Sequence, residues 1–236
     1  MIKTLVIAAA VLAVIVFAGC AGVKHKDQPV GSVYDEKTME SLVKPPDKKP
    51  WYLRWMIRIA DRKAGKKMLT GRVLAWSSKI SISSGLLELY VEDGAASILE
   101  KRLIALVRMI ISYTVPSPFA IDINSAKYKE YGITTDEIAG LRGEKDLETV
   151  SGFSVREKAA LEYARAVSKT PIVLDNEILN RLRYNFSERE IVALAALSAK
   201  VNYWARLLEG LRIKPAGYTD DPVLHLDEYN TLEERY

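Results

Sequence analysis

Few side chains in this sequence are suited to nucleophilic or metal chemistry. Its 236 residues include one cysteine, Cys20, and two histidines, His25 and His225. A lone cysteine excludes an intramolecular disulfide, and three Cys/His side chains cannot complete a structural zinc site of four such ligands. No glycine-rich phosphate loop or dinucleotide fingerprint occurs either. We therefore expect no metal and no cofactor.

The most suggestive polar spacing lies in the stretch SPFAIDIN. It places Ser117, Asp122 and Asn124 close together in the sequence, with Tyr113 just before them and Tyr128 just after. In a cluster of these polar groups, Asp122 is a candidate acid or base and Ser117 is a candidate nucleophile.

A structural role for Ser117 competes with catalysis. A serine nucleophile needs an adjacent base, and the two histidines lie near the two ends of the chain. Ser117 followed by Pro118 is also typical of a helix N-cap with proline at the first helical position. We favour the N-cap, which places Asp122 in the second turn of the following helix.

The elements that position these residues are predicted to be helices. Three Ser/Thr-x-x-Glu capping boxes precede runs of helical apolar periodicity: Thr134/Glu137, Ser154/Glu157 and Ser187/Glu190. The periodicity predicts helices over 51–67, 95–113, 119–131, 136–142, 155–168, 176–184 and 188–211. Only the KISISS stretch (79–84) is a strand candidate. With 49% hydrophobic and 27% charged residues, the composition is that of a globular protein, and we expect an all-α domain.

The first twenty residues have the features of a lipoprotein signal peptide. Lys3 precedes an uncharged apolar run, and the run ends in Phe-Ala-Gly before Cys20. This ending resembles the bacterial lipobox, which implies a signal peptide over 1–19 and a lipid on Cys20. An uncleaved signal anchor is the alternative, because about 19 apolar residues can span a bilayer. Either way we expect export, and Ala21 in place of aspartate favours a periplasm-facing outer membrane over the inner membrane.

The remaining chain divides by composition and charge. We expect a polar tether over 20–50, a helical domain over 51–214 and an acidic tail over 215–236. The segment 44–72 is basic and lacks a nucleic-acid-binding motif, so we expect an anionic lipid or an acidic protein as its partner and no nucleic acid.

The predicted helix over 51–67 is basic and amphipathic. We place Tyr52, Trp55, Met56 and Ile59 on its apolar face. Such a helix can lie on an anionic membrane or pack this face on the domain core, and we favour packing on the core.

The order of the helices resembles the carboxymuconolactone decarboxylase and alkylhydroperoxidase D-like family. The segments that carry the resemblance are KRLIALVRMIISY, SPFAIDINSAKYKEYGITTDEIAGLRG, FSVREKAALEYARAVSK and FSEREIVALAALSAKVNYWARLLEGLRI, within about residues 95–213. The resemblance implies an all-helical homo-oligomer. In the peroxidase branch of the family, a Cys-x-x-Cys pair followed four residues later by histidine reduces peroxide.

The redox residues of that branch are missing from the corresponding positions. Ser117 and Ala120 stand at the two cysteine positions, Asn124 at the histidine position, and Ala105 near the position of an assisting glutamate. Peroxide reduction by a dithiol needs a thiolate and a resolving thiol, and neither is present. The catalytic candidates that remain are Asp122, Ser117, Asn124 and Tyr113.

We interpret the chain as a membrane-anchored member of this family that lacks thiol peroxidase activity and acts as a binding or assembly module. The alternative is a carboxymuconolactone decarboxylase-type enzyme that uses Asp122 on a small carboxylate or lactone. A peroxiredoxin-type antioxidant activity would require thiols from a partner.

Overall fold

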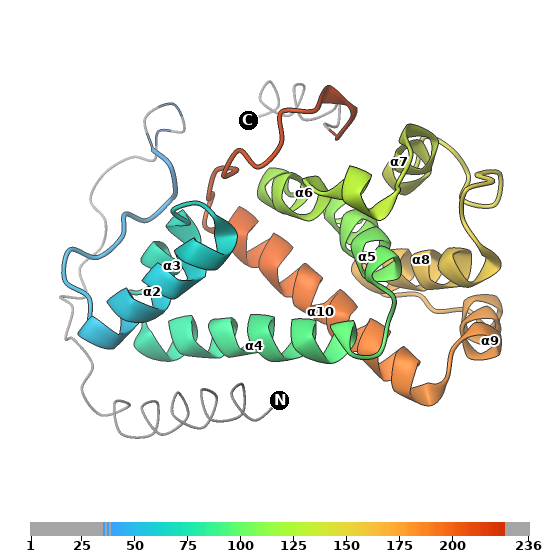
Figure 1. Cartoon of the computed structure of the whole chain (residues 1–236), viewed down its shortest axis with the longest axis horizontal. Coiled ribbons are helices and arrows are strands. Elements are labelled where there is room, and N and C mark those ends of the chain that lie inside the picture. The colour runs from blue at the N-terminus through green and yellow to red at the C-terminus, as the bar shows by residue number, and fades with distance from the viewer. Residues whose placement is uncertain (1–34, 36, 38, 225–236) are drawn as a thin grey trace. The chain divides into compact units, whose positions relative to one another are not determined.

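All regular elements in the described part of the chain are helical (Figure 1). The computed structural model describes residues 35, 37 and 39–224. The predicted all-α class is confirmed for the described residues. The predictions for the signal peptide, Cys20 and the two histidines lie outside the described residues.

The described residues form two compact units that divide after Leu87, within helix α4 (Ser78–Ala96). The range 51–214, expected as one helical domain, therefore includes parts of both units. Each unit has its own buried apolar cluster.

The first unit contains α2 (Trp51–Ala64), α3 (Leu69–Leu74) and the first half of α4. Its cluster of buried side chains comprises Tyr52, Leu53, Ile57 and Ala75. The apolar face predicted for α2 was wrong in part, because Trp55 is 49% exposed. The aliphatic side chains of Leu53 and Ile57, four residues apart, form the packed stripe instead.

The stretch 79–84, the one strand candidate, is helical and belongs to α4, in agreement with the predicted all-α class. The hydroxyl groups of Ser83 and Ser84 both donate to the carbonyl of Ile80, at 3.1 and 2.8 Å. Serine hydroxyls that bond to a carbonyl one turn earlier are satisfied inside a helix. The polar and apolar alternation of the stretch is therefore compatible with helix.

The second unit is built around α5 (Lys101–Thr114), which contacts α6, α7, α8 and α10. Figure 1 shows these helices gathered about α5: α6 (Pro118–Ser125), α7 (Thr135–Arg142), α8 (Val155–Ser168) and α10 (Glu188–Gly210). A further helix, α9 (Asn176–Asn185), contacts α8 and α10. The side chains of Leu106, Val107, Ile110 and Ile111 on α5 are completely buried. Burial of one such side chain stabilises a fold by about 1.5–3 kcal/mol.

α10 is long and apolar enough, by composition alone, to cross a membrane. It nevertheless packs against α5, α6, α8 and α9 within its unit. Its buried apolar side chains, among them Leu194, Leu197 and Val201, belong to the core of this unit.

Two predicted helices have different bounds in the structure. The helix expected over 95–113 begins at Lys101, because Glu100 has extended backbone angles and ends a turn that follows α4. The helix expected over 119–131 consists of α6 and a separate 3-10 helix, η1 (Tyr128–Tyr131). Gly132 ends η1 at a φ of 64°, in the left-handed conformation that favours glycine.

The three predicted capping boxes are confirmed at the starts of α7, α8 and α10. In the last of them, Glu190 accepts a hydrogen bond from the backbone N–H of Ser187 at 2.8 Å. This bond, the Ser187 hydroxyl and the guanidinium of Arg156 lower the pKa of Glu190 to about 2. Glu190 therefore stays ionised at any neutral or mildly acidic pH.

Arg102 on α5 joins the first two capping boxes. Its guanidinium pairs with Glu137 of the α7 box and with Glu157 of the α8 box, the latter at 2.9 Å. Burial opposes the charge of Arg102, but the hydrogen bonds to the two glutamates outweigh it and raise its pKa above the usual value. The side chain of Glu137 is only 2% exposed, so Arg102 is the counterion of a buried carboxylate.

Candidate functional site

Ser117 caps α6, as the sequence predicts. Its backbone is extended and its hydroxyl accepts a hydrogen bond from the N–H of Ala120, at 3.4 Å. Pro118 occupies the first helical position. Ser117 and Ala120 are 1% and 2% exposed, so the two positions predicted to correspond to the thiol pair are both buried.

Asp122 faces a segment that follows α10 in the sequence. Its Oδ1 atom accepts hydrogen bonds from the backbone N–H groups of Tyr218, at 2.6 Å, and Thr219, at 2.9 Å. Its Oδ2 atom is buried and has no hydrogen-bond partner in the structure. Asp122 is 5% exposed, so its carboxylate is held by these two amides rather than by solvent.

Other side chains bind the same segment, residues 218–224, which we call the C-terminal strap. The hydroxyl of Tyr113 donates to the carbonyl of Leu224 at 3.2 Å, and that of Tyr128 donates to the carboxylate of Asp221 at 2.8 Å. Arg142 donates to the strap at the carbonyl of Val223. The acidic tail expected from residue 215 thus begins with residues that pack on α6 and α7 through η2 (Pro222–Leu224).

Tyr113 is a poor candidate for proton transfer in this arrangement. Burial raises the pKa of its phenol well above the usual value, with smaller opposing effects from Arg142 and Ser125. The phenol therefore remains a hydrogen-bond donor to the strap. The structure brings Asp122, Tyr113 and Tyr128 to one segment, but each is occupied by an internal hydrogen bond.

Asn124 does not join this cluster, although the sequence suggested that it might. Its Oδ1 atom accepts a hydrogen bond from the guanidinium of Arg108, and its Nδ2 atom donates to the hydroxyl of Ser112, both at 2.9 Å. Residues 122 and 124 are two apart on α6, and positions with this spacing do not face each other on a helix. Asp122 and Asn124 consequently serve different networks.

The partners of Asn124 extend into an ion network that the sequence analysis missed. Arg108 pairs with Glu92 at 3.0 Å, and the ammonium of Lys200 pairs with Glu92 and Glu88. Burial opposes the ionisation of Glu92, but the charges of Arg108 and Lys200 outweigh it and lower its pKa. Lys200 is 2% exposed. A lysine inside the apolar run ALSAKVNYW was the one sequence signal for this network, because lysine is rarely buried without a counterion.

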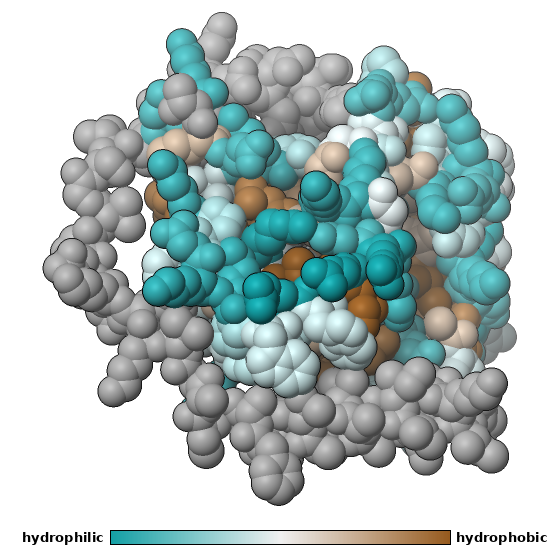
Figure 2. Space-filling model, turned by 60° about the vertical axis from the view of Figure 1, so that its left-hand side comes forward, coloured by the Kyte–Doolittle hydropathy of each residue, from teal (hydrophilic) through white to brown (hydrophobic). Residues whose placement is uncertain are grey.

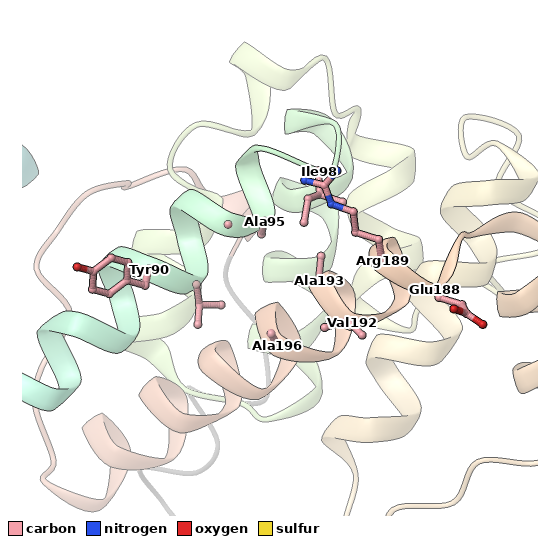
Figure 3. A pocket seen from close by; sticks show the side chains of 10 residues that line it. Tyr90, Ala95, Ile98, Glu188, Arg189, Val192, Ala193 and Ala196 are labelled. Atoms are coloured by element: carbon pink, nitrogen blue, oxygen red, sulfur yellow. The ribbon is translucent and has the colours of Figure 1, made fainter. Parts of the chain in front are cut away.

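A groove lies elsewhere in the second unit, between the end of α4 and the start of α10 (Figure 3). Its volume is about 490 Å³, and Tyr90, Ile98 and Val192 are among the apolar residues that line it. The two charged residues on its wall, Glu188 and Arg189, both belong to the first turn of α10. None of the candidate site residues lines this groove, and most of the residues that line it are apolar.

No group of three His, Cys, Asp or Glu side chains within the described residues is placed to hold a metal ion. Cys20, His25 and His225, the residues with the strongest ligand chemistry, lie outside that part of the chain.

Comparison with solved structures identifies the fold. The debrominase Bmp8, as a variant in complex with 2,3,4-tribromopyrrole, superposes with a TM-score of 0.62 over 83% of this chain and 97% of Bmp8, at 18% identity. A protein of Ralstonia eutropha JMP134, described as an alkylhydroperoxidase AhpD core, gives a TM-score of 0.62 over 76% of this chain and 95% of its own, at 16% identity. This chain has the AhpD-like fold. A peroxidase-related protein of Silicibacter sp. TM1040 shares the AhpD-like fold with a TM-score of 0.62 at 15% identity, over 77% of this chain and 95% of its own.

Sequence comparison covers a smaller region. The uncharacterized protein YnjA of Escherichia coli (strain K12) is 32% identical over 99 residues, which are 42% of this chain and 53% of YnjA. The match therefore spans about half the length of YnjA. No family model matches the chain. The AhpD-like fold thus rests on the arrangement of the helices.

Proposed function

We propose that the protein is a membrane-anchored, exported module of AhpD-like fold that binds or assembles and does not reduce peroxides. One observation carries this proposal: the candidate catalytic groups are committed to internal structure. Ser117 caps α6, and Asp122 and Tyr113 hold the C-terminal strap. With Ala120 at the second position of the motif, no thiol pair stands at the start of α6.

The anchoring part of the proposal rests on the lipobox-like sequence that ends at Cys20. Lipid on this cysteine would leave the mature protein without a free thiol. We place the anchored protein at a periplasm-facing outer membrane. We also propose self-association, with the apolar groove beside Val192 as the contact surface, because Val192 is 69% exposed there.

A double substitution tests whether the motif positions retain the geometry of a dithiol site. Residues 117 and 120 are the N-cap and the third helical residue of α6, and Cα atoms three residues apart in a helical turn lie within the range that a disulfide spans. Ser117→Cys with Ala120→Cys is expected to give peroxide consumption that depends on a dithiol reductant, because a helix N-terminus lowers the pKa of a thiol. The wild-type protein is expected to show none.

The single variants Ser117→Cys and Ala120→Cys are the matched controls, since each lacks a partner thiol to resolve the oxidised cysteine. Peroxide consumption by purified wild-type protein, after its N-terminal cysteine has been blocked, would contradict the proposal. Consumption that appears only in whole membranes would instead indicate thiols supplied by a partner.

A decarboxylase-type enzyme is the second candidate, and one observation favours it. The Oδ2 atom of Asp122 is buried and unpartnered, and buried unsatisfied oxygens concentrate at functional sites. Asp122→Asn keeps an oxygen that can accept from Tyr218 and Thr219 but removes the acid or base. We expect ligand binding and assembly to survive this substitution. Loss of a turnover of small carboxylates or lactones in the variant would instead favour the enzyme.

A further inference from the structure

Helix α2 carries tryptophan and arginine along one exposed stripe. Trp51, Trp55, Arg58 and Arg62 recur at intervals of four, three and four residues, which places them on the same side of a helix. Trp51 is 68% exposed and Trp55 is 49% exposed, and both arginines are exposed. We call these four residues and Arg54 the α2 Trp–Arg face. Two exposed indole rings one turn apart are unusual for a surface that contacts only water.

The described residues of the first unit do not balance the charge of this face. The side chains of Arg54, Arg58 and Arg62 make no hydrogen bond or ion pair with any other described residue. The only acidic residue of α2 is Asp61, whose carboxylate pairs with Arg72 at 2.7 Å.

Asp61 is therefore engaged inside the α2–α3 turn. Its carboxylate also accepts the N–H of Met68 at 2.8 Å. Burial opposes its ionisation, but the bonds from Arg72 and Met68 outweigh burial and lower the pKa of Asp61. The carboxylate stays ionised and bound, so the exposed side of α2 presents net positive charge.

Figure 2 turns the side that bears α2 and α3 toward the viewer. Hydrophilic side chains cover much of this surface, and side chains of intermediate hydropathy and smaller strongly apolar areas lie among them.

We propose that the α2 Trp–Arg face docks on an anionic phospholipid surface. Indole rings settle at the headgroup level of a bilayer, and arginines beside them bind lipid phosphates. The rise along a helix places Trp51 and Arg62 about 16 Å apart, so α2 can lie along the surface with all four side chains in the headgroup layer. The opposite side of α2 keeps its packing, because Leu53 and Ile57 are buried in the unit core.

The inference rests on the membrane anchoring of the proposed function. Trp51 follows Cys20 by 31 positions, so even a fully extended connection confines α2 to within about 110 Å of the anchor. Such confinement raises the effective concentration of the lipid surface far above that of any free acidic protein. This favours lipid over an acidic protein as the partner.

Quenching of tryptophan fluorescence by brominated lipids tests the docking. The full chain, extracted with its anchor, is reconstituted in phosphatidylcholine vesicles with and without phosphatidylglycerol. We expect extra quenching in the anionic vesicles, and we expect its loss in Trp51→Phe/Trp55→Phe, which leaves Trp76 and Trp204 in place. Each arginine near an anionic surface contributes about fivefold to the affinity for the lipid. Arg58→Glu/Arg62→Glu should therefore lower this affinity at least about 25-fold and remove the extra quenching. Salt at about 1 M, where the screening length is about 3 Å, should have the same effect.

The matched control reverses two exposed cations away from α2, in Lys169→Glu/Arg183→Glu, and is expected to quench as the wild type does. Equal quenching in both vesicle types, or extra quenching that survives Arg58→Glu/Arg62→Glu, would overturn the proposal. So would a photocrosslinker at position 55 that, in intact membranes, captures a protein and no lipid. The mass of the N-terminal peptide reports the lipid on Cys20 separately, so failure of the anchor and failure of the α2 contact are distinguishable.

Discussion

Replacing Arg102 with alanine is expected to lower the free energy of unfolding by about 3–5 kcal/mol. The substitution would leave the carboxylate of Glu137, 2% exposed, without its counterion, and it would remove the link from α5 to Glu157. Arg102 also donates to the backbone carbonyl of Gly132, at 2.9 Å. Chemical denaturation followed by circular dichroism measures the effect.

Two variants provide comparisons for Arg102→Ala: one tests its charge against its geometry, and the other removes an exposed ion pair elsewhere. Arg102→Lys keeps the charge but cannot place donors on both glutamates and a carbonyl, so an intermediate loss is expected. Lys127→Ala removes an ion pair whose two side chains are 67% and 64% exposed, and it should change stability by less than about 1 kcal/mol. If Arg102→Ala behaved like Lys127→Ala, the view of Arg102 as the counterion that joins the two caps would be wrong.

The environment of Glu137 leaves little space for rearrangement in such variants. A Cβ atom added at Gly152 would lie 2.7 Å from Oε1 of Glu137 and 2.9 Å from its Cδ atom. Only glycine permits this close approach of the backbone to the carboxylate. The sequence SGFS before α8 therefore meets a packing requirement that local propensity does not reveal.

Replacing Asp122 with alanine is expected to release the C-terminal strap while the rest of the second unit stays folded. The amides of Tyr218 and Thr219 would lose their acceptor, and a hydrogen bond to a charged group contributes about 1.5–3 kcal/mol. The exchange of these two amide hydrogens should accelerate by roughly 10- to 100-fold. Hydrogen exchange followed by mass spectrometry or NMR measures this directly.

Asp220→Ala is the matched control, because Asp220 is exposed and lies in the strap without touching Asp122. Its amide protection should resemble that of the wild type. If protection at Tyr218 and Thr219 persisted in Asp122→Ala, the strap would be held by its other contacts, at Tyr113, Tyr128 and Arg142.

Local signals in the sequence were sufficient to predict where several helices of the second unit begin. The capping boxes and the Ser-Pro start of α6 depend on residues within one helical turn, and the structure has them where the sequence predicts. The bounds of α8 were predicted to the residue for the same reason. Local chemistry also explains why Ser117 serves as a cap.

Features set by tertiary contacts were missed. The network of Glu92, Arg108 and Lys200 joins three helices, and no spacing within one helix reveals it. The packed face of α2 was misassigned because apolar residues lie on more than one side of that helix, and only the unit core selects among them. The strap was interpreted as part of a polar tail because its residues show no periodicity, although their partners lie on α5, α6, η1 and α7.

The hydrogen bonds between Asp122 and the strap join residues 96 and 97 positions apart. Because a chain is synthesised from its N-terminus, α6 is made before the strap, and the carboxylate of Asp122 cannot bind these two amides until residue 219 has emerged. Until then, water supplies its hydrogen-bond donors. A chain cut short before residue 218 would leave the carboxylate of Asp122 without both of its amide donors, and it would therefore lack the contact that fixes the strap on α6.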